Sequence, residues 1–247
     1  MRLTEINLRE KKFHDKLQLK RKGRFENIFY KALYNMFADF NAYISKVAQN
    51  KTVLDYGCGV GSITEKIAKL SPSKLFGIDI SEVSIDKAIE NAKTLNLQID
   101  YTVDNCENTK FKAKTFDLVF GSGILHHLNL EKSISEINRI LKEKGEMVFL
   151  EPLGTNPLIN IYRKLTPDSR SVDEHPLLKK DFDFIDSLFE DVSVRYYGFF
   201  TLIFFLFYKN PSNSLTFKII SKLDNYFFKI KYFKNLAWSV MIVAKKN

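Results

Sequence analysis

Apolar and polar residues alternate along this chain in the pattern of short buried strands separated by amphipathic helices. Strands are predicted from short runs rich in β-branched and aromatic residues, and helices from apolar residues that return every three or four positions. The predicted strands are residues 52–54, 75–80, 99–103, 116–120, a fifth within 141–152, 192–197 and 237–244. Alternation of this kind predicts an α/β fold with a parallel sheet and helices on both faces.

The predicted helices lie between and before these strands. They cover residues 25–47, 63–70, 81–95, a segment ending at Leu141, and 178–189, with a short helix after Pro157 and a glycine C-cap at Gly145. Residues 1–24 are predicted to be a polar, helical arm. We therefore divide the chain into an N-terminal helical arm or cap at 1–50 and an α/β domain at 51–247.

The amino-acid composition is typical of a globular domain, and the low cysteine content indicates a reducing compartment. The 247 residues are 45% hydrophobic and 27% charged, and the two cysteines cannot build a disulfide framework or a complete zinc site. No signal peptide is evident, so we expect a cytoplasmic protein. The apolar run 198–208 is about half of the roughly 20 residues that a spanning helix needs.

Positive charge is concentrated at the two ends of the chain. Residues 1–30 carry a net +5 and residues 209–247 a net +7, which leaves −3 for the middle of a chain whose total is +9. Basic ends suit an anionic lipid or nucleic acid surface, and a solvated lysine-rich surface is the simpler alternative.

A glycine-rich turn follows the first predicted strand. Asp55 ends the strand, and Gly57, Gly59 and Gly61 alternate with Cys58 and Val60 before a helix begins. The spacing differs from the dinucleotide pattern G-x-G-x-x-G, because Ser62 stands where its third glycine would be. D-x-G-x-G-x-G instead resembles the first motif of class I S-adenosylmethionine-dependent methyltransferases. That resemblance implies S-adenosylmethionine as cofactor, S-adenosylhomocysteine as product, and Asp55 near the cofactor's ammonium group.

Acidic residues also end the second and third predicted strands. Asp79, followed by Ile80, stands 24 residues after Asp55, close to the offset at which such folds place a ribose-binding carboxylate. The family resemblance further implies that Asp104, with its neighbours Asn105 and Cys106, meets the adenine. The structural alternatives are a helix cap at Asp79 and an Asx turn at Asp104 or Asn105.

Two later segments extend the resemblance. Residues 116–128 match the family pattern F-D-x-V followed by L-H-H, and the small residues Gly121 and Ser122 within them would leave space for the methionine part of the cofactor. Residues 141–145 match the family pattern L-K-x-G-G, except that Lys144 replaces its first glycine. The resemblance implies a Rossmann-like doubly wound sheet of seven strands, mostly parallel with an antiparallel last strand. To this are added the N-terminal helices and a helical insertion, 199–236, before the last strand.

Acceptor specificity is expected beyond the fifth strand. Residues 151–177 contain E-P-L-G-x-N-P and D-E-H-P-L, which resemble a type 11/12-like bacterial subgroup of the family. The two proline-containing turns of this segment are well placed to cover the methyl group, and we interpret 152–177 and 199–236 as insertions on the acceptor side or in a cap. Four residues at strand ends are candidates for a general base: His126, His127, Glu151 and His175. Each could equally make a structural hydrogen bond. No clustered ligand spacing is seen, so no metal is expected.

The function predicted is methyl transfer to a small-molecule or lipid-linked acceptor. One alternative is an RNA methyltransferase that uses the basic ends, and the absence of an N-P-P-Y-type motif disfavours it. A second is a non-catalytic cofactor-binding protein. A third is an NAD-dependent dehydrogenase, which the glycine spacing disfavours. The aromatic residues of 199–236 are expected to pack on the N-terminal helix or form a homodimer contact; a hydrophobic acceptor pocket or a membrane-surface helix are the functional alternatives.

Overall fold

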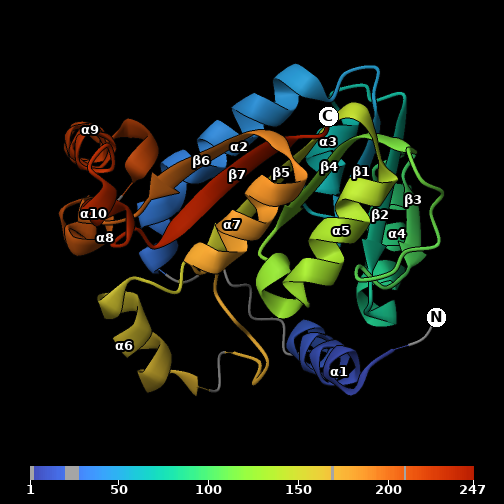
Figure 1. Cartoon of the computed structure of the whole chain (residues 1–247), viewed down its shortest axis with the longest axis horizontal. Helices are drawn as coiled ribbons and strands as arrows, with labels where there is room; N and C mark the ends of the chain where they lie inside the picture. Colours follow the sequence, from blue (N-terminus) through green and yellow to red (C-terminus); the bar gives the residue numbers. More distant parts are fainter. Residues whose placement is uncertain (1–2, 20–27, 168–169, 209) are drawn as a thin grey trace.

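The strands form one seven-stranded sheet in the computed structural model, which describes residues 3–19, 28–167, 170–208 and 210–247 (Figure 1). Their order is β3-β2-β1-β4-β5-β7-β6, and β7 runs antiparallel to both neighbours while the other pairs are parallel. The prediction of a mostly parallel sheet with an antiparallel last strand is confirmed. The strands are β1 (Thr52–Tyr56), β2 (Lys74–Asp79), β3 (Asp100–Val103), β4 (Phe116–Ser122), β5 (Leu141–Pro152), β6 (Glu190–Tyr197) and β7 (Ser239–Lys245).

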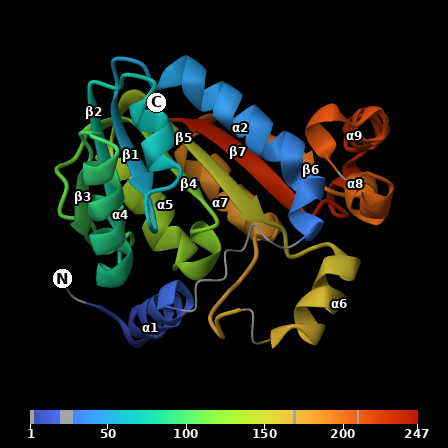
Figure 2. The ribbon, with the colours of Figure 1, turned by 180° about the vertical axis from the view of Figure 1, so that it is seen from behind.

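Helices cover both faces of this sheet (Figures 1 and 2). The α-helices are α1 (Glu5–Leu19), α2 (Tyr34–Val47), α3 (Thr64–Ala68), α4 (Glu82–Thr94), α5 (Leu130–Ile140), α6 (Pro157–Leu165), α7 (Lys179–Leu188), α8 (Phe200–Ile203), α9 (Leu215–Phe227) and α10 (Lys231–Lys234). Short 3₁₀ helices are η2 (Ile28–Leu33), η3 (Leu125–His127), η5 (Phe205–Phe207) and η6 (Pro211–Asn213).

Alternate residues of each strand enter two separate cores. Leu54 of β1 packs with α5 and α7 on one face, whereas the adjacent Val53 packs with α2 and α3 on the other. Because successive strand side chains point to opposite faces, a strand buried on both sides must be apolar throughout. This explains why the central strands are read from the sequence as continuous apolar runs.

The connection between α5 and β5 differs from the prediction. The helix ends at Ile140, so the predicted glycine C-cap at Gly145 is wrong. The chain instead turns inside β5 at Lys144, which adopts the left-handed φ of 59°. A Cβ at Gly145 would lie 2.8 Å from the Lys142 carbonyl oxygen, and this close approach accounts for the glycine.

The N-terminal segments are helical where they are described. The predicted helix 25–47 divides into the 3₁₀ segment η2 and the α-helix α2, while its first three residues, like residues 20–24 of the predicted arm, lie outside the described part of the chain. Within the arm, residues Glu5–Leu19 form α1.

The insertion 199–236 packs on this N-terminal region. The Phe29 and Phe205 rings lie 4.7 Å apart, and Tyr34 and Phe217 meet edge to face at 5.9 Å. The buried Asp224 carboxylate accepts hydrogen bonds from the Phe200 amide and the Thr201 hydroxyl, at 2.6 and 2.7 Å. No helix in the described ranges has the length and apolarity to cross a bilayer.

The centre of the sheet is where packing contributes most stability. Phe149 is fully buried in β5, with its ring 6.0 Å from that of Tyr56. We expect Phe149→Ala to lower the free energy of unfolding by about 3–5 kcal/mol, because it removes a buried ring and leaves a cavity. Phe207→Ala, at a residue 70% exposed, should change it by less than about 0.5 kcal/mol. Urea unfolding of both variants checks this, and equal losses would contradict the assigned core.

Candidate functional site

The turn after β1 is held in a left-handed conformation by its glycines. Gly57, Gly59 and Gly61 have φ values of 78°, 54° and 83°. The Gly57 and Cys58 amides both donate to the Ile78 carbonyl oxygen, at 2.9 and 2.8 Å, which fastens the turn to the end of β2. Glycine adopts positive φ without the steric cost that other residues meet.

Only one of these three glycines faces open space. A Cβ at Gly57 would lie 2.5 Å from the Ile124 side chain, and a Cβ at Gly61 would lie 2.3 Å from the Tyr101 hydroxyl. At Gly59 no atom of the described residues lies within 4 Å of that position. The backbone at Gly59 is therefore open to a ligand, which is the function expected of this motif.

Asp79 joins the glycine turn to the following helix. Its Oδ2 accepts the Gly59 amide and its Oδ1 the Ser81 amide, both at 2.9 Å. Burial raises the pKa of Asp79 above its ordinary value, although both hydrogen bonds oppose this. Ser81 caps α4 as predicted, accepting the Ser84 amide at 3.0 Å, and Ile80 lies half-buried between them.

Asp55 is buried directly beneath the turn. The Thr64 hydroxyl donates to its Oδ2 at 2.6 Å. Burial raises the pKa of Asp55 to about 7, and the negative charge of Asp79 acts in the same direction. A cationic ligand group placed here would stabilise the charged carboxylate.

The end of β3 forms the Asx turn that the sequence offered as an alternative. Asp104 is buried, with Oδ1 accepting the Asn105 amide and Oδ2 the Lys110 amide, both at 2.9 Å. Asn105 in turn accepts the Glu107 amide at 2.9 Å, and the carbonyl of the buried Cys106 accepts the Tyr56 hydroxyl. The roles of residues 104–106 toward adenine stay a prediction.

Glu151 organises the end of β4. Its Oε1 accepts the Ile124 and Leu125 amides at 3.0 and 2.8 Å, and its Oε2 lies 2.6 Å from Nδ1 of His126. Burial raises the pKa of Glu151 to about 7. This carboxylate is fully buried and positions η3 and the His126 ring.

The small residues Gly121 and Ser122 at the end of β4 lie just before η3 in the chain. A Cβ at Gly121 would lie 2.7 Å from the Tyr56 carbonyl oxygen, so β1 and β4 approach closely there. Ser122, the last residue of β4, is half-buried.

His175 reaches the same neighbourhood through its backbone. Its amide donates to the His126 carbonyl oxygen at 2.8 Å, while its side chain is exposed, with Nδ1 3.3 Å from the Asp173 carbonyl oxygen. The structure thus brings the predicted histidines 126, 127 and 175 together at one edge of the sheet.

Sequence reasoning missed the position of α1, which crosses the carboxyl ends of the strands (Figure 2). His127 Nδ1 lies 3.0 Å from Glu10 Oε2 on this helix, and His14 Nε2 lies 3.7 Å from the same oxygen. Burial lowers the pKa of His127 to about 4, so its ring is neutral at pH 7. The only signal in the sequence is the i, i+4 spacing of Glu10 and His14, which places both on one helix face.

Further contacts fix α1 over this edge. Two are hydrogen bonds: the Ser81 hydroxyl donates to the Asp15 carboxylate, and the Asn7 side-chain amide donates to the Glu107 carboxylate at 3.2 Å. Two are ion pairs: Lys11 with Glu82 at 3.0 Å, and Arg9 with Asp173 through two hydrogen bonds of 2.8 Å each. These partners come from α4, from the loop after β3 and from the loop before α7.

A cavity of about 290 Å³ lies elsewhere, between α2 and the outer strands, and is lined by Tyr43, Glu146 and Arg195 among others.

Comparison with known proteins agrees with this geometry. Residues 53–145 match the model of the methyltransferase domain family. The ubiquinone biosynthesis O-methyltransferase of Pelagibacter ubique is 37% identical over 115 residues, which cover 46% of this chain and 47% of that protein. The sterol 24-C-methyltransferase of Saccharomyces cerevisiae is 31% identical over 134 residues, 53% of this chain and 34% of that one.

Solved structures share the fold over nearly the whole chain. The phosphoethanolamine N-methyltransferase 2 of Haemonchus contortus, in complex with phosphomonomethylethanolamine and S-adenosylhomocysteine, superposes with a TM-score of 0.65 at 17% identity. That match covers 99% of this chain and 60% of that protein. Residues 53–145 therefore belong to the methyltransferase domain family, and the solved structure named above contains S-adenosylhomocysteine, the product of S-adenosylmethionine. The chain spans about half or less of the length of the first two relatives described above.

The burial of Asp55 makes stability depend on pH. The pKa of Asp55 is about 7 in the folded state and 3.8 ordinarily, so the folded state binds this proton more tightly than the unfolded state does. The contribution of Asp55 to the free energy of unfolding is therefore lost as pH rises from about 4 through 7. At about 1.4 kcal/mol per tenfold change in proton affinity, the full effect is of the order of 4 kcal/mol. Asp55→Asn should therefore gain stability relative to the wild type between pH 4 and pH 8, as measured by urea unfolding. A difference between the two proteins that does not vary with pH would contradict this.

Proposed function

We propose that this chain transfers a methyl group from S-adenosylmethionine to a small-molecule acceptor at the edge where β1, β2 and β4 end. The observation that carries the proposal is the pairing of an open backbone at Gly59 with the Asp79 carboxylate that holds it. When bound, the cofactor supplies a methyl group that its sulfonium already activates. The protein's task is then to bind, orient and enclose the reactants.

The residues at the three strand ends suit the parts of this cofactor. Each Asp79 oxygen accepts one backbone amide and keeps a further lone pair, so the carboxylate can also accept from two vicinal ribose hydroxyls. Asp55 would balance the ammonium group, and the methionine part would lie beside the small residues Gly121 and Ser122 at the end of β4. Asp104, Asn105 and Cys106 would border the adenine.

We assign acceptor binding to the region where η3, α1 and the described residues of 152–177 meet. His126 and His175 are the candidates for a general base, whereas Glu151 is buried with its oxygens engaged by η3 and acts by positioning. The relatives methylate oxygen, carbon or nitrogen, so family membership leaves the acceptor atom open.

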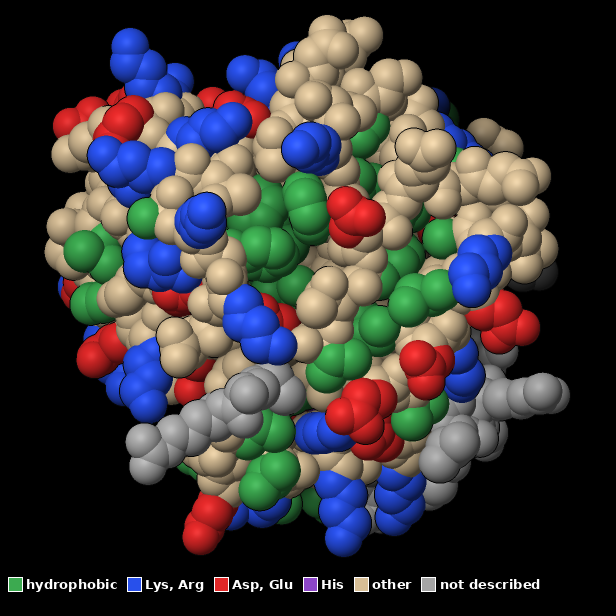
Figure 3. All heavy atoms as spheres, turned by 90° about the vertical axis from the view of Figure 1, so that its right-hand side faces the viewer, with side chains coloured by type: hydrophobic (Ala, Val, Ile, Leu, Met, Phe, Trp, Pro, Cys, Tyr) green, Lys and Arg blue, Asp and Glu red, His purple; other side chains and the backbone are tan. Residues whose placement is uncertain are grey.

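The position of α1 favours a small acceptor over RNA. This helix lies over the proposed active edge and would hinder a long polymer. On the face that holds α4 and β3, lysine and arginine side chains are interspersed with acidic ones instead of forming a continuous basic patch (Figure 3). Nucleic acid binding depends on such a patch.

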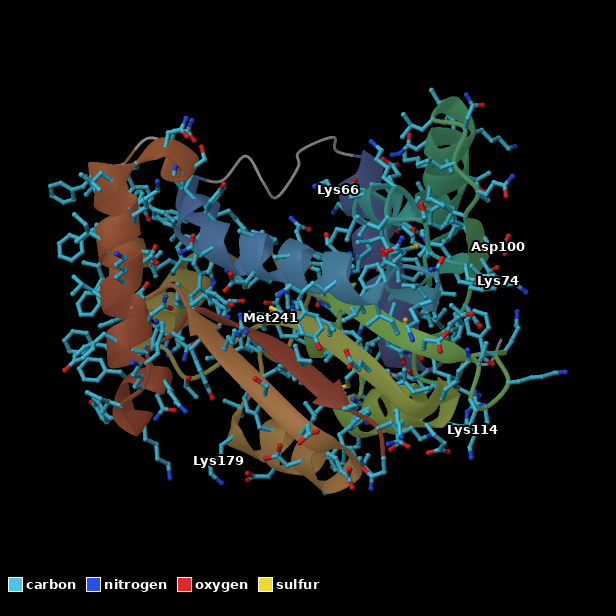
Figure 4. All side chains as sticks on the ribbon, turned by 90° about the horizontal axis from the view of Figure 1, so that it is seen from above. Lys66, Lys74, Asp100, Lys114, Lys179 and Met241 are labelled. Carbon is cyan, nitrogen blue, oxygen red and sulfur yellow. The ribbon has the colours of Figure 1, made fainter. Side chains whose placement is uncertain are left out.

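The outer side of the insertion favours a lipid-linked acceptor. Aromatic rings project from α9 and its neighbours away from the sheet (Figure 4). Large apolar side chains there are highly exposed, including Leu206 at 74%, Phe207 at 70% and Leu215 at 73%. The segment 209–247, which contains α9 and α10, carries lysines 218, 222, 229, 231 and 234 and has Asp224 as its single acid. Exposed apolar residues in a lysine-rich part of the chain suit the surface of an anionic membrane.

Calorimetric titration with S-adenosylhomocysteine tests cofactor binding. We expect the wild type to bind S-adenosylhomocysteine and not to bind NADH. Asp79→Ala removes two charged hydrogen bonds to ribose, about 3 kcal/mol or a hundredfold in affinity. Gly59→Ala should also abolish binding, because its Cβ enters the open space. The control is Asp100→Ala, at an exposed residue on the outer edge of the sheet (Figure 4). Undiminished binding by Asp79→Ala, or binding of NADH instead, would refute the assigned cofactor site.

Flotation with lipid vesicles tests the membrane surface. The wild type should float with vesicles of anionic phosphatidylglycerol and not with neutral phosphatidylcholine. A double change, Leu206→Glu with Phe207→Glu, should abolish flotation and leave S-adenosylhomocysteine affinity unaltered, because both side chains are solvent-exposed. Equal flotation of wild type and variant would contradict the lipid contact, as would a solution dimer that buries these residues.

A further inference from the structure

A buried cluster of two histidines and a glutamate lies where α1 crosses the end of β4. Glu10 and His14 come from α1 and His127 from η3, and one ligand atom from each lies within 4.8 Å of the others. The Glu10 carboxylate oxygen Oε2 is 3.0 Å from His127 Nδ1 and 3.7 Å from His14 Nε2. The two rings stand edge to face with centroids 4.8 Å apart.

Several buried polar atoms of this cluster lack a well-formed hydrogen bond among the described residues. Glu10 Oε2 and both ring nitrogens of His127 make no hydrogen bond of normal geometry with any described residue. The side chains of Glu10 and His127 are only 5% and 2% exposed, so water does not easily replace the missing partners. Buried polar atoms are nearly always paired, because leaving them unpaired costs free energy. The unpaired atoms of Glu10 and His127 point to a missing ligand.

We propose that Glu10, His14 and His127 bind a divalent transition-metal ion, with zinc as the best fit. Two imidazoles and one carboxylate are a donor set of zinc sites that keep a fourth position open. Zinc at about 2.0–2.1 Å from tetrahedral ligands separates them by about 3.3 Å, and the two measured separations bracket this value.

Neighbouring groups support this choice of ligands. The Ser171 hydroxyl donates to the other Glu10 oxygen, Oε1, and so orients the carboxylate, as outer hydrogen bonds do in metal sites. His126 and Glu174 form a second group with His127. Their polar atoms are already engaged, because His126 Nδ1 contacts Glu151 and Glu174 pairs with Arg170 at 3.2 Å.

The ion would connect α1 to the end of β4. Its ligands come from segments more than a hundred residues apart, which is why spacing along the sequence led us to expect no metal. The fourth position would accept water or an oxygen of the acceptor. Only this last role rests on the proposed function; the binding of the ion does not.

Titration of the full chain with zinc chloride tests the site. We expect one zinc ion per chain, and cobalt(II) at the same site should give the strong visible absorption of a four-coordinate ion. His14→Ala and Glu10→Gln should each weaken zinc binding at least a hundredfold. His175→Ala, a nearby histidine outside the cluster, should bind zinc as the wild type does. Thermal melting identifies any variant that has failed to fold, and His14, whose side chain is 28% exposed, is the position least sensitive to truncation.

Two results would overturn the proposal: absence of stoichiometric zinc binding by the folded wild type, or equal binding by the His14→Ala and His175→Ala variants. S-adenosylhomocysteine titration of the same samples separates this inference from the proposed function. If the wild type binds S-adenosylhomocysteine but no zinc, the metal site alone is overturned. Failure of the wild type to bind S-adenosylhomocysteine while zinc still binds refutes the cofactor assignment and leaves the metal site standing.

Discussion

Asp79 accepts one hydrogen bond from the turn after β1 and one from the start of α4, and the edge of the sheet that we propose as the active site is organised around this carboxylate. Without it, the left-handed turn at Gly57–Gly61 would be fixed to β2 only through the Ile78 carbonyl. Two carboxylates, Asp55 and Asp79, are kept close together in a buried place, and burial raises the pKa of both. A cationic, hydroxyl-bearing ligand would relieve that cost, so the features that strain the free protein favour cofactor binding.

The same edge depends on a second constraint, the placement of α1. This helix contributes little to the two main cores, and polar contacts with α4, η3 and the loops hold it in place. Such contacts are individually weak when they are exposed to solvent. A buried ion shared by Glu10, His14 and His127 would provide a stronger link, and it would make closure of the site sensitive to metal.

Much of the fold could be predicted from the sequence because it depends on local patterns. The glycine turn, the acidic strand ends and the Ser81 cap are set by residues close in the chain, and the antiparallel last strand followed from the family resemblance. The position of α1 could not be predicted, because Glu10 and His127 are separated by the whole cofactor-binding half of the domain. Lys144 shows a different limit: this lysine adopts the left-handed φ at a position where the family pattern has glycine, and β5 already begins at Leu141.

The candidate site divides in the same way. The proposed cofactor side rests on backbone geometry that the motif determines, whereas the proposed acceptor side would involve α1, η3 and described residues of 152–177, whose contacts are long-range. A crystal structure with bound S-adenosylhomocysteine tests the central claim most directly. The account predicts both ribose hydroxyls within hydrogen-bond distance of Asp79 and the amino-acid portion over the Gly57–Gly61 turn. A ligand bound elsewhere, with Asp79 contacting only the Gly59 and Ser81 amides, would contradict it.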